Sequence, residues 1–329
     1  MAHGQRDINW LRISNAAKEK GFTIRHFGDI IHARLINDYP AIVDKVQVTL
    51  FTEKEEVERR LAVVRDVYRA RNQRMEQMTD ESVDTFYSCL LCQSFAPSHV
   101  CVITPERLGL CGAYNWLDGK AAYEIDPTGG NQPLLKGRCI DPVRGQWENI
   151  NKYVWANSKQ AVTEVNAYSM MENPMTSCGC FEVVVALLPE CNGVMIVNRE
   201  YMGDTPSGMK FSTLASATGG GQQNPGFAGV GRTYITSRKF IAAEGGHKRI
   251  VWMPKALKES MKEELEQIGK RLEIENFMDL IADESITTDP NELQEHLQKI
   301  NHPALSMWDI TEPSPEAAAV DAERAAALV

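Results

Sequence analysis

The chain has 329 residues and carries a net charge of −9 at neutral pH, with a pI near 5.4. This acidic balance argues against nucleic-acid binding, which needs a basic stripe, and no apolar run approaches the roughly 20 residues of a membrane span. The first residues, 1–7, lack the apolar core of a signal peptide. We therefore expect a cytoplasmic protein of about two domains that binds neither nucleic acid nor a membrane.

Residues 1–82 have the pattern of a small α/β module. We expect helices at 13–20 and 30–36 and strands at 22–27 and 46–51. Thr52 and Glu55 have the spacing of a capping box and predict that a long helix begins there. Six arginines between 59 and 74 are interpreted as a solvated helix face balanced by glutamates, with a phosphate-binding surface as the less favoured alternative.

Residues 83–312 alternate short strands, helices and turns, which predicts an α+β or mixed α/β domain of mixed sheets and surrounding helices. Strands at 183–188 and 194–197 should pair across the turn sequence 189–193. We expect a further strand at 249–253 and helices at 146–157, 254–272 and 290–300. The glycine-rich stretch 218–231 is either a tight buried loop near the cysteines or a phosphate cradle, although it lacks the lysine of a P-loop. Segment 313–329, rich in Ala and Glu, is predicted to be a disordered tail or a marginal helix.

Six of the eight cysteines form two groups. The first has the spacing Cys-x2-Cys-x8-Cys-x9-Cys and comprises Cys89, Cys92, Cys101 and Cys111. Four thiolates saturate one zinc ion or one cubic iron–sulfur cluster. A zinc ribbon pairs two Cys-x2-Cys hooks, whereas this chain has one hook and two dispersed cysteines. The spacing therefore favours the larger cluster.

The second group is Cys178-Gly179-Cys180. Two thiolates and two deprotonated backbone amides of such a tripeptide can lie in one plane, and square-planar coordination suits Ni(II) or Cu(II) rather than zinc. Glycine lets the backbone approach the metal closely. The competing interpretations are small buried side chains and disulfides. Disulfides are disfavoured in a reducing cytosol, and a bridge within this tripeptide would close a strained ring.

The segment from Phe86 to Gly112, with four cysteines in place, closely resembles the metal-binding segment of acetyl-CoA synthase. This enzyme is the nickel subunit of the carbon monoxide dehydrogenase/acetyl-CoA synthase system. The resemblance continues through Pro174–Glu182 and Thr218–Phe227 and reaches about Leu305. It covers nearly the whole chain.

The resemblance implies a ligand set. Cys89, Cys92, Cys101 and Cys111 would bind a [4Fe–4S] cluster, and Cys92 would bridge it to a proximal nickel. Cys178 and Cys180 would bind two nickel ions, and the backbone nitrogens of Gly179 and Cys180 would complete the plane of the distal one. Phe95 matches a phenylalanine beside the open side of the proximal position, which also accepts copper or zinc.

The resemblance also implies an acyltransferase of anaerobic carbon fixation. It assembles acetyl-CoA from CO, a methyl group donated by a methylated corrinoid iron–sulfur protein, and coenzyme A. Bacterial members carry a further N-terminal domain that docks CO dehydrogenase. That domain and part of the middle domain are not seen in this sequence, so we expect weakened docking and impaired activity. An iron–sulfur electron carrier without nickel and a structural zinc module are the alternatives.

Two cysteines and two histidines have no ligand role in these motifs. Cys139 and Cys191 match no ligand position and are interpreted as structural. His99 and His247 could handle metal or protons, but isolated histidines are more often part of the hydrogen-bonded structure, which is the favoured interpretation here.

Overall fold

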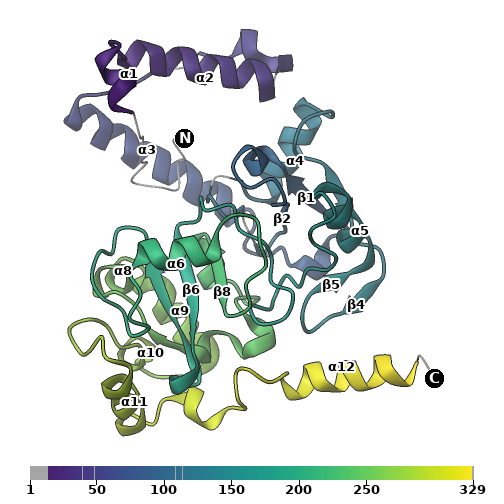
Figure 1. The fold of residues 1–329 in the computed structure, drawn as a ribbon, viewed down its shortest axis with the longest axis vertical. Helices are drawn as coiled ribbons and strands as arrows, with labels where there is room; N and C mark the ends of the chain where they lie inside the picture. Colours follow the sequence, from purple (N-terminus) through teal and green to yellow (C-terminus); the bar gives the residue numbers. More distant parts are fainter. Residues whose placement is uncertain (1–13, 39, 48, 108, 113, 328–329) are drawn as a thin grey trace.

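The computed structural model describes residues 14–327 apart from 39, 48, 108 and 113 (Figure 1). Its first part, up to residue 82, is helical and consists of α1 (Asn15–Glu19), α2 (Ile24–Asp38), η1 (Pro40–Lys45), α3 (Lys54–Gln73) and η2 (Asp80–Ser82). In Figure 1, α1 and α2 lie at one end of the molecule, and α3 leads from them toward the rest. None of the described helices is both long and apolar enough to cross a bilayer.

The two strands expected in this first part are wrong as far as its residues are described. α2 already begins at Ile24, where the Thr23 N–H donates to Nδ1 of His26 at 3.0 Å. A strand needs a neighbouring strand to pair its backbone groups, whereas a helix satisfies them locally. The expected capping box is also wrong, because Glu53 is the N-cap residue of α3 and makes no side-chain cap bond.

The arginines of α3 only partly form the solvated helix face that the sequence predicts. Arg59 and Arg60 form ion pairs with Glu56 on the exposed helix face, as expected of a solvated surface. Arg71 is different, because its side chain is only 8% exposed and pairs with Asp118 at 2.5 Å. This contact links α3 to α4 (Trp116–Ile125).

The next part of the chain forms two small antiparallel sheets. One has the order β2-β1-β3 and consists of β1 (Thr85–Cys89), β2 (Cys101–Ile103) and β3 (Pro133–Leu135). The other pairs β4 (Cys139–Asp141) with β5 (Gln146–Trp147), and α5 (Glu148–Asn157) follows, close to where the sequence predicts a helix. α4 packs on β1 at Gly119, where an added Cβ would meet the Cβ of Tyr87 at 2.8 Å.

The largest sheet has four strands in the order β8-β6-β7-β9. β6 (Val183–Leu188) pairs antiparallel with β7 (Gly193–Asn198) and with β8 (Phe227–Val230), and β7 runs parallel to β9 (Ile250–Trp252). The predicted pairing of β6 with β7 is confirmed. The side chains of β6 alternate between two cores: Val183 and Val185 face one, Val184 and Ala186 the other.

Helices and 3-10 turns surround this sheet: α6 (Phe211–Thr218), α7 (Arg232–Thr236), η5 (Ala242–Glu244), η6 (Gly246–Arg249), α8 (Lys255–Ser260), α9 (Lys262–Leu272), α10 (Phe277–Leu280), α11 (Pro290–Lys299) and η7 (Pro303–Ser306). The single helix expected at 254–272 is two helices, because the backbone leaves the helical conformation at the buried Met261. α11 begins at Pro290 as predicted, and the side chain of its N-cap residue Asp289 accepts from Asn291 N–H and Glu292 N–H.

The C-terminal segment is helical, which is one of the two alternatives that its composition left open. It contains the helix α12 (Pro315–Ala326), capped by the Ser314 side chain, and Figure 1 shows it running along one edge of the molecule. The guanidinium of Arg144, 5% exposed, pairs with Asp321 of this helix at 2.7 Å. A buried guanidinium needs carboxylate partners, and this tertiary contact is not visible in the composition of the tail.

Candidate metal centre

The first cysteine group lies where β1 meets β2. Cys89 ends β1, Cys101 begins β2, and the two residues are direct cross-strand partners. The chain between them turns through η3 (Leu91–Ser94), which carries Cys92. The Cys92 carbonyl accepts hydrogen bonds from the N–H groups of Phe95 and Ala96, at 3.0 and 3.1 Å. Cys111 follows in the turn after β2.

The second group lies just before β6. Gly179 has φ +104°, a conformation that side-chain-bearing residues rarely adopt. The Cys180 N–H points back to Sγ of Cys178 at 3.3 Å. Arg199 from the end of β7 donates to the carbonyl oxygens of Gly179 and Phe181, at 2.8 and 3.0 Å. One guanidinium thus holds the backbone on both sides of Cys180.

Three thiols of the two groups meet. The sulfur atoms of Cys92, Cys178 and Cys180 all lie within 4.8 Å of one another, and all three residues are half-buried. Among the described residues, this is the one set of three or more potential metal ligands so closely spaced. The structure does not bring Cys89, Cys101 and Cys111 into that set. The thiolates around an iron–sulfur cluster lie further apart than those around a single metal ion. Cys89, Cys101 and Cys111 can therefore be cluster ligands without belonging to the close triad.

The electrostatics of the triad favour a bound cation. Hydrogen bonds to Cys178 and Cys180, followed by burial, raise the pKa of the Cys92 thiol far above its usual range. The hydrogen bond with Cys180 is the largest cause that raises the pKa of Cys178, to about 12. Thiols this close cannot all become thiolates unless a positive charge replaces their protons. A metal ion supplies that charge, and its binding releases the protons.

The remaining three cysteines of the first group also interact with one another. Burial raises the pKa of the Cys101 thiol, and the charges of Cys89 and Cys111 raise it further. Cys89 and Cys101 belong to the same apolar core as Val184 of the large sheet. The thiols therefore lie in a low-polarity region between the two sheets, where soft metal ligands are protected from water.

Two hydrogen bonds of the buried residue His99 connect the two cysteine groups. No sequence motif predicts these hydrogen bonds. Nδ1 of His99, a buried residue just before Cys101, lies 2.9 Å from Oγ1 of Thr176 just before Cys178. Gln93, beside Cys92, donates to the His99 carbonyl at 3.1 Å. Burial lowers the pKa of His99 to about 4, so its ring is neutral at pH 7. Among the described residues, neither His99 nor His247 belongs to a metal-ligand group.

The glycine-rich loop after α6 is a tight loop beside the cysteines, which is one of the two alternatives that the sequence left open. A Cβ added at Gly219 would lie 3.3 Å from the Cα of Gly179. The Gly221 N–H donates to the Ser177 carbonyl at 2.8 Å, and the Gly221 carbonyl accepts from the Ser98 hydroxyl at 2.8 Å. The loop thus contacts both cysteine segments.

The other residues singled out in the sequence lie as follows. Phe95 follows η3 immediately, and its side chain is 77% exposed, so it faces solvent beside Cys92 rather than the core. Cys139 is exposed in β4, and Cys191 is buried in the turn between β6 and β7. Neither cysteine joins a metal-ligand group within the described part of the chain.

A close triad of thiols beside a second thiol group, on this α/β scaffold, has the donor set of a thiolate metalloprotein. Comparison with known families narrows this class. Residues 68–311 match the family model for the C-terminal part of the ACS/CODH beta subunit, and residues 1–57 match the model for the CO dehydrogenase/acetyl-CoA synthase complex beta subunit. The chain belongs to the ACS/CODH beta subunit family, as the resemblance predicted.

Relatives in this family are similar over most of this chain. It is 54% identical over 310 residues to the carbon monoxide dehydrogenase/acetyl-CoA synthase subunit alpha of Moorella thermoacetica, covering 92% of this chain and 42% of that protein. It is 45% identical to the acetyl-CoA decarbonylase/synthase complex subunit beta of Methanopyrus kandleri, covering 92% and 63%. The chain thus spans about half the length of the curated relatives it matches. The solved C-terminal domain of an acetyl-coenzyme A synthase alpha subunit is 52% identical, covering 41% of this chain and 99% of that one, with a TM-score of 0.39.

Proposed function

We propose that this chain holds a dinickel site bridged to a [4Fe–4S] cluster and catalyses the formation of acetyl-CoA. The observation that carries the proposal is the meeting of Cys92 with Cys178 and Cys180 within 4.8 Å. Cys92 belongs to the Cys-x2-Cys hook, whereas the other two come from a distant segment. Cys92 therefore belongs to both the first cysteine group and the triad. A centre in which nickel is bridged to an iron–sulfur cluster requires such a shared cysteine.

The donor set fits this centre. Cys89, Cys92, Cys101 and Cys111 supply four thiolates, the number that a [4Fe–4S] cluster takes. Cys178 and Cys180 supply two thiolates for nickel, with the backbone nitrogens of Gly179 and Cys180 as further donors. Gly179 already has the backbone conformation that turns both cysteines toward Cys92. When bound, this centre would supply low-valent nickel at which CO and a methyl group are joined.

The chain's own residues would then position and shield this chemistry. Arg199 anchors the carbonyls on either side of Cys180, and His99 anchors the segment before Cys178. The glycine-rich loop packs tightly at residue 219, where an added Cβ would lie 3.1 Å from the Ala215 carbonyl oxygen and 3.3 Å from the Cα of Gly179. Phe95 is proposed to limit access to the proximal nickel, since it follows Cys92 closely and is not buried in a core.

The domain division and the partners are part of the same proposal. Residues 83–312 would form the metal domain, and residues 1–82 a supporting module. The substrates would be CO, coenzyme A and a methyl group from a corrinoid iron–sulfur protein. The names of the relatives describe subunits of a complex, so we propose that this chain works with CO dehydrogenase.

Anaerobic reconstitution of the chain with iron, sulfide and nickel tests the proposal. We expect about four irons and up to two nickels per chain, a brown colour that fades in air, and acetyl-CoA formation from CO, a methylated corrinoid protein and coenzyme A. Iron without nickel would contradict it in favour of an electron carrier. A colourless preparation that takes only zinc would contradict it in favour of a structural zinc module.

A further inference from the structure

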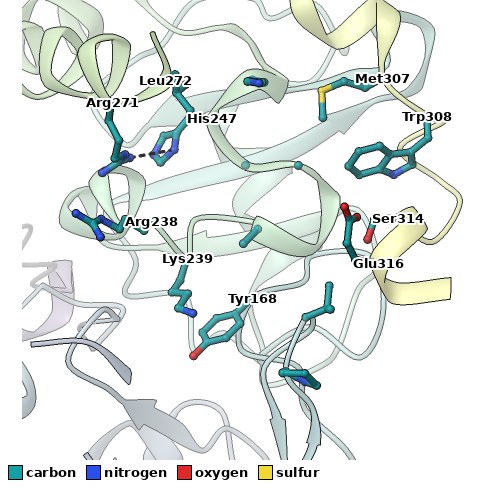
Figure 2. A pocket seen from close by; sticks show the side chains of 16 residues that line it. Tyr168, Arg238, Lys239, His247, Arg271, Leu272, Met307, Trp308, Ser314 and Glu316 are labelled. Carbon is teal, nitrogen blue, oxygen red and sulfur yellow. Dashed lines mark hydrogen bonds between the residues drawn. The ribbon is translucent and has the colours of Figure 1, made fainter. Parts of the chain in front are cut away.

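A cavity of about 640 Å³ lies between η6, α9 and the start of α12 (Figure 2). Its volume is typical of a small-molecule site. None of its lining residues is one of the six clustered cysteines or directly adjacent to one. A ligand here would therefore bind at a place distinct from the candidate metal centre.

The lining of the cavity is strongly basic although the whole chain is acidic. This lining includes Arg238, Lys239, Lys248 and Arg271, against a single acidic residue, Glu316. Lys239 is paired with Glu81. Within the described part of the chain, Arg238, Lys248 and Arg271 have no carboxylate at ion-pairing distance. Three cationic side chains are thus available at one cavity of a protein with net charge −9.

Arg271 is held in place by a buried histidine. Nε2 of His247 must carry the ring proton, because it lies 2.6 Å from the Ile235 carbonyl oxygen, which can only accept. Nδ1 is then free to accept from Nη2 of Arg271 at 3.3 Å, the contact drawn in Figure 2. Burial lowers the pKa of His247 to about 4, so the ring stays neutral and adds no charge of its own.

The two arginines repel each other. Burial first, and then the charge of Arg238, lower the pKa of Arg271. Holding like charges together has an energetic cost that a bound anion removes. Arginine also presents a planar fork that matches the oxygens of phosphate.

The opposite side of the cavity is apolar and aromatic. Figure 2 shows Met307 and Trp308 across the cavity from Arg238 and Arg271, with Glu316 near Trp308. The guanidinium of Arg249 lies 4.8 Å from the centre of the Trp308 ring and braces it. A carboxylate such as Glu316 accepts hydrogen bonds from hydroxyl or amino groups.

We propose that this cavity binds a nucleotide-class ligand, whose phosphate groups contact Arg238 and Arg271 and whose ring packs near Trp308. Such ligands combine the two chemistries that the cavity separates: charged phosphates at one end, and a planar ring with hydroxyl or amino groups at the other. Two sources share this chemistry. One is a free nucleotide that acts as an effector, and the other is the nucleotide end of coenzyme A, the substrate in the proposed function.

Titration of the whole chain with ADP, read by calorimetry and by tryptophan fluorescence, tests the site. We expect saturable binding, with inorganic pyrophosphate weaker than ADP because it lacks the ring. Arg271→Gln and Arg238→Gln should each weaken ADP binding at least about tenfold, the loss of one charge-assisted contact. Lys270→Gln removes the same charge from the same helix outside the cavity lining and should leave binding unchanged.

Competition identifies the source of the ligand. Displacement of ADP by coenzyme A would identify the substrate's nucleotide end, and ADP binding that coenzyme A does not displace would identify a free nucleotide. Absence of saturable ADP binding up to about millimolar concentration would overturn the proposal. So would an equal loss in Lys270→Gln, because it would indicate diffuse charge attraction. Metal-free protein gives the same readout, so this result is independent of the metal centre.

Discussion

Gly179 has a backbone conformation that decides how the two cysteines beside it are presented. Its φ of +104° lies where glycine is favoured, yet a Cβ added there would meet no atom within 4 Å. The constraint is therefore the conformation and not the space. The sequence pattern indicates a different reason for the glycine, namely close approach of the backbone to a metal.

Gly179→Ala should thus destabilise the fold through backbone strain, by about 1–2 kcal/mol. Chemical denaturation of the metal-free protein measures this change. Gly208→Ala is a matched control, because Gly208 also has positive φ and open space around it but belongs to neither cysteine group in the sequence. Both variants should lose similar stability, and only Gly179→Ala should also load less nickel. Full nickel loading in Gly179→Ala would contradict the proposed role of this tripeptide.

Phe95 is a second residue at which an effect on the metal site can be measured without an effect on the stability of the fold. Because its side chain is 77% exposed, Phe95→Ala should change the free energy of unfolding by no more than about 0.5 kcal/mol. For comparison, Phe86 is fully buried, and Phe86→Ala should lower the free energy of unfolding by about 3–5 kcal/mol. Iron and nickel contents of Phe95→Ala should be unchanged, whereas CO binding, followed by infrared spectroscopy, should change. Unchanged CO binding would rule out the access role.

His302 makes stability depend on pH. Burial lowers its pKa to about 4, and its Nδ1 accepts from the Ala304 N–H at 3.2 Å. The unfolded chain binds the proton near pH 6.5 and the folded chain only near pH 4, so folding becomes less favourable as pH falls through this window. The denaturant midpoint of the protein should fall between pH 7 and pH 4. The midpoint of His302→Asn, in which the side chain keeps a hydrogen-bond acceptor, should fall less steeply over the same range. An identical pH slope in both proteins would contradict this assignment.

At the scale of elements, α12 shows how one ion pair docks a terminal helix. Arg144 pairs with Asp141, Glu172 and Asp321, and only Asp321 comes from α12. In Asp321→Asn the buried guanidinium keeps two carboxylates, so the fold should persist while α12 opens more often. Hydrogen–deuterium exchange of α12 amides should become several-fold faster. Glu323→Gln, on the same helix and exposed, is the control. Equal exchange in both variants would show that α12 docks by other contacts.

The elements also show where sequence patterns are sufficient. The pairing of β6 with β7 follows from a local turn sequence, and the start of α11 at Pro290 follows from the local cap Asp289. The strand expected at residues 22–27 fails because a strand depends on a partner, and α2 begins there instead. The docking of α12 depends on Arg144, a residue far away in the sequence.

At the scale of the whole molecule, the spacing of six cysteines predicts a metal site, and the resemblance of the segments around them predicts the family, which the comparisons confirm. The roles of individual cysteines remain proposals, although the structure brings Cys92 to Cys178 and Cys180. The hydrogen bonds from Arg199 to the carbonyls of Gly179 and Phe181 and the contact of His99 with Thr176 could not be predicted. Each joins single residues that are far apart in the sequence and that no local pattern marks.

The proposed function assigns nickel to the Cys92–Cys178–Cys180 triad and iron to the first cysteine group. Elemental analysis of Cys180→Ser, reconstituted anaerobically beside Cys139→Ser, tests this most directly. Serine is a harder and weaker donor for nickel than a thiolate, and Cys139 is exposed and outside the triad. We predict that Cys180→Ser keeps about four irons and loses its nickel, and that Cys139→Ser keeps both metals. Loss of iron with retention of nickel in Cys180→Ser would contradict the account.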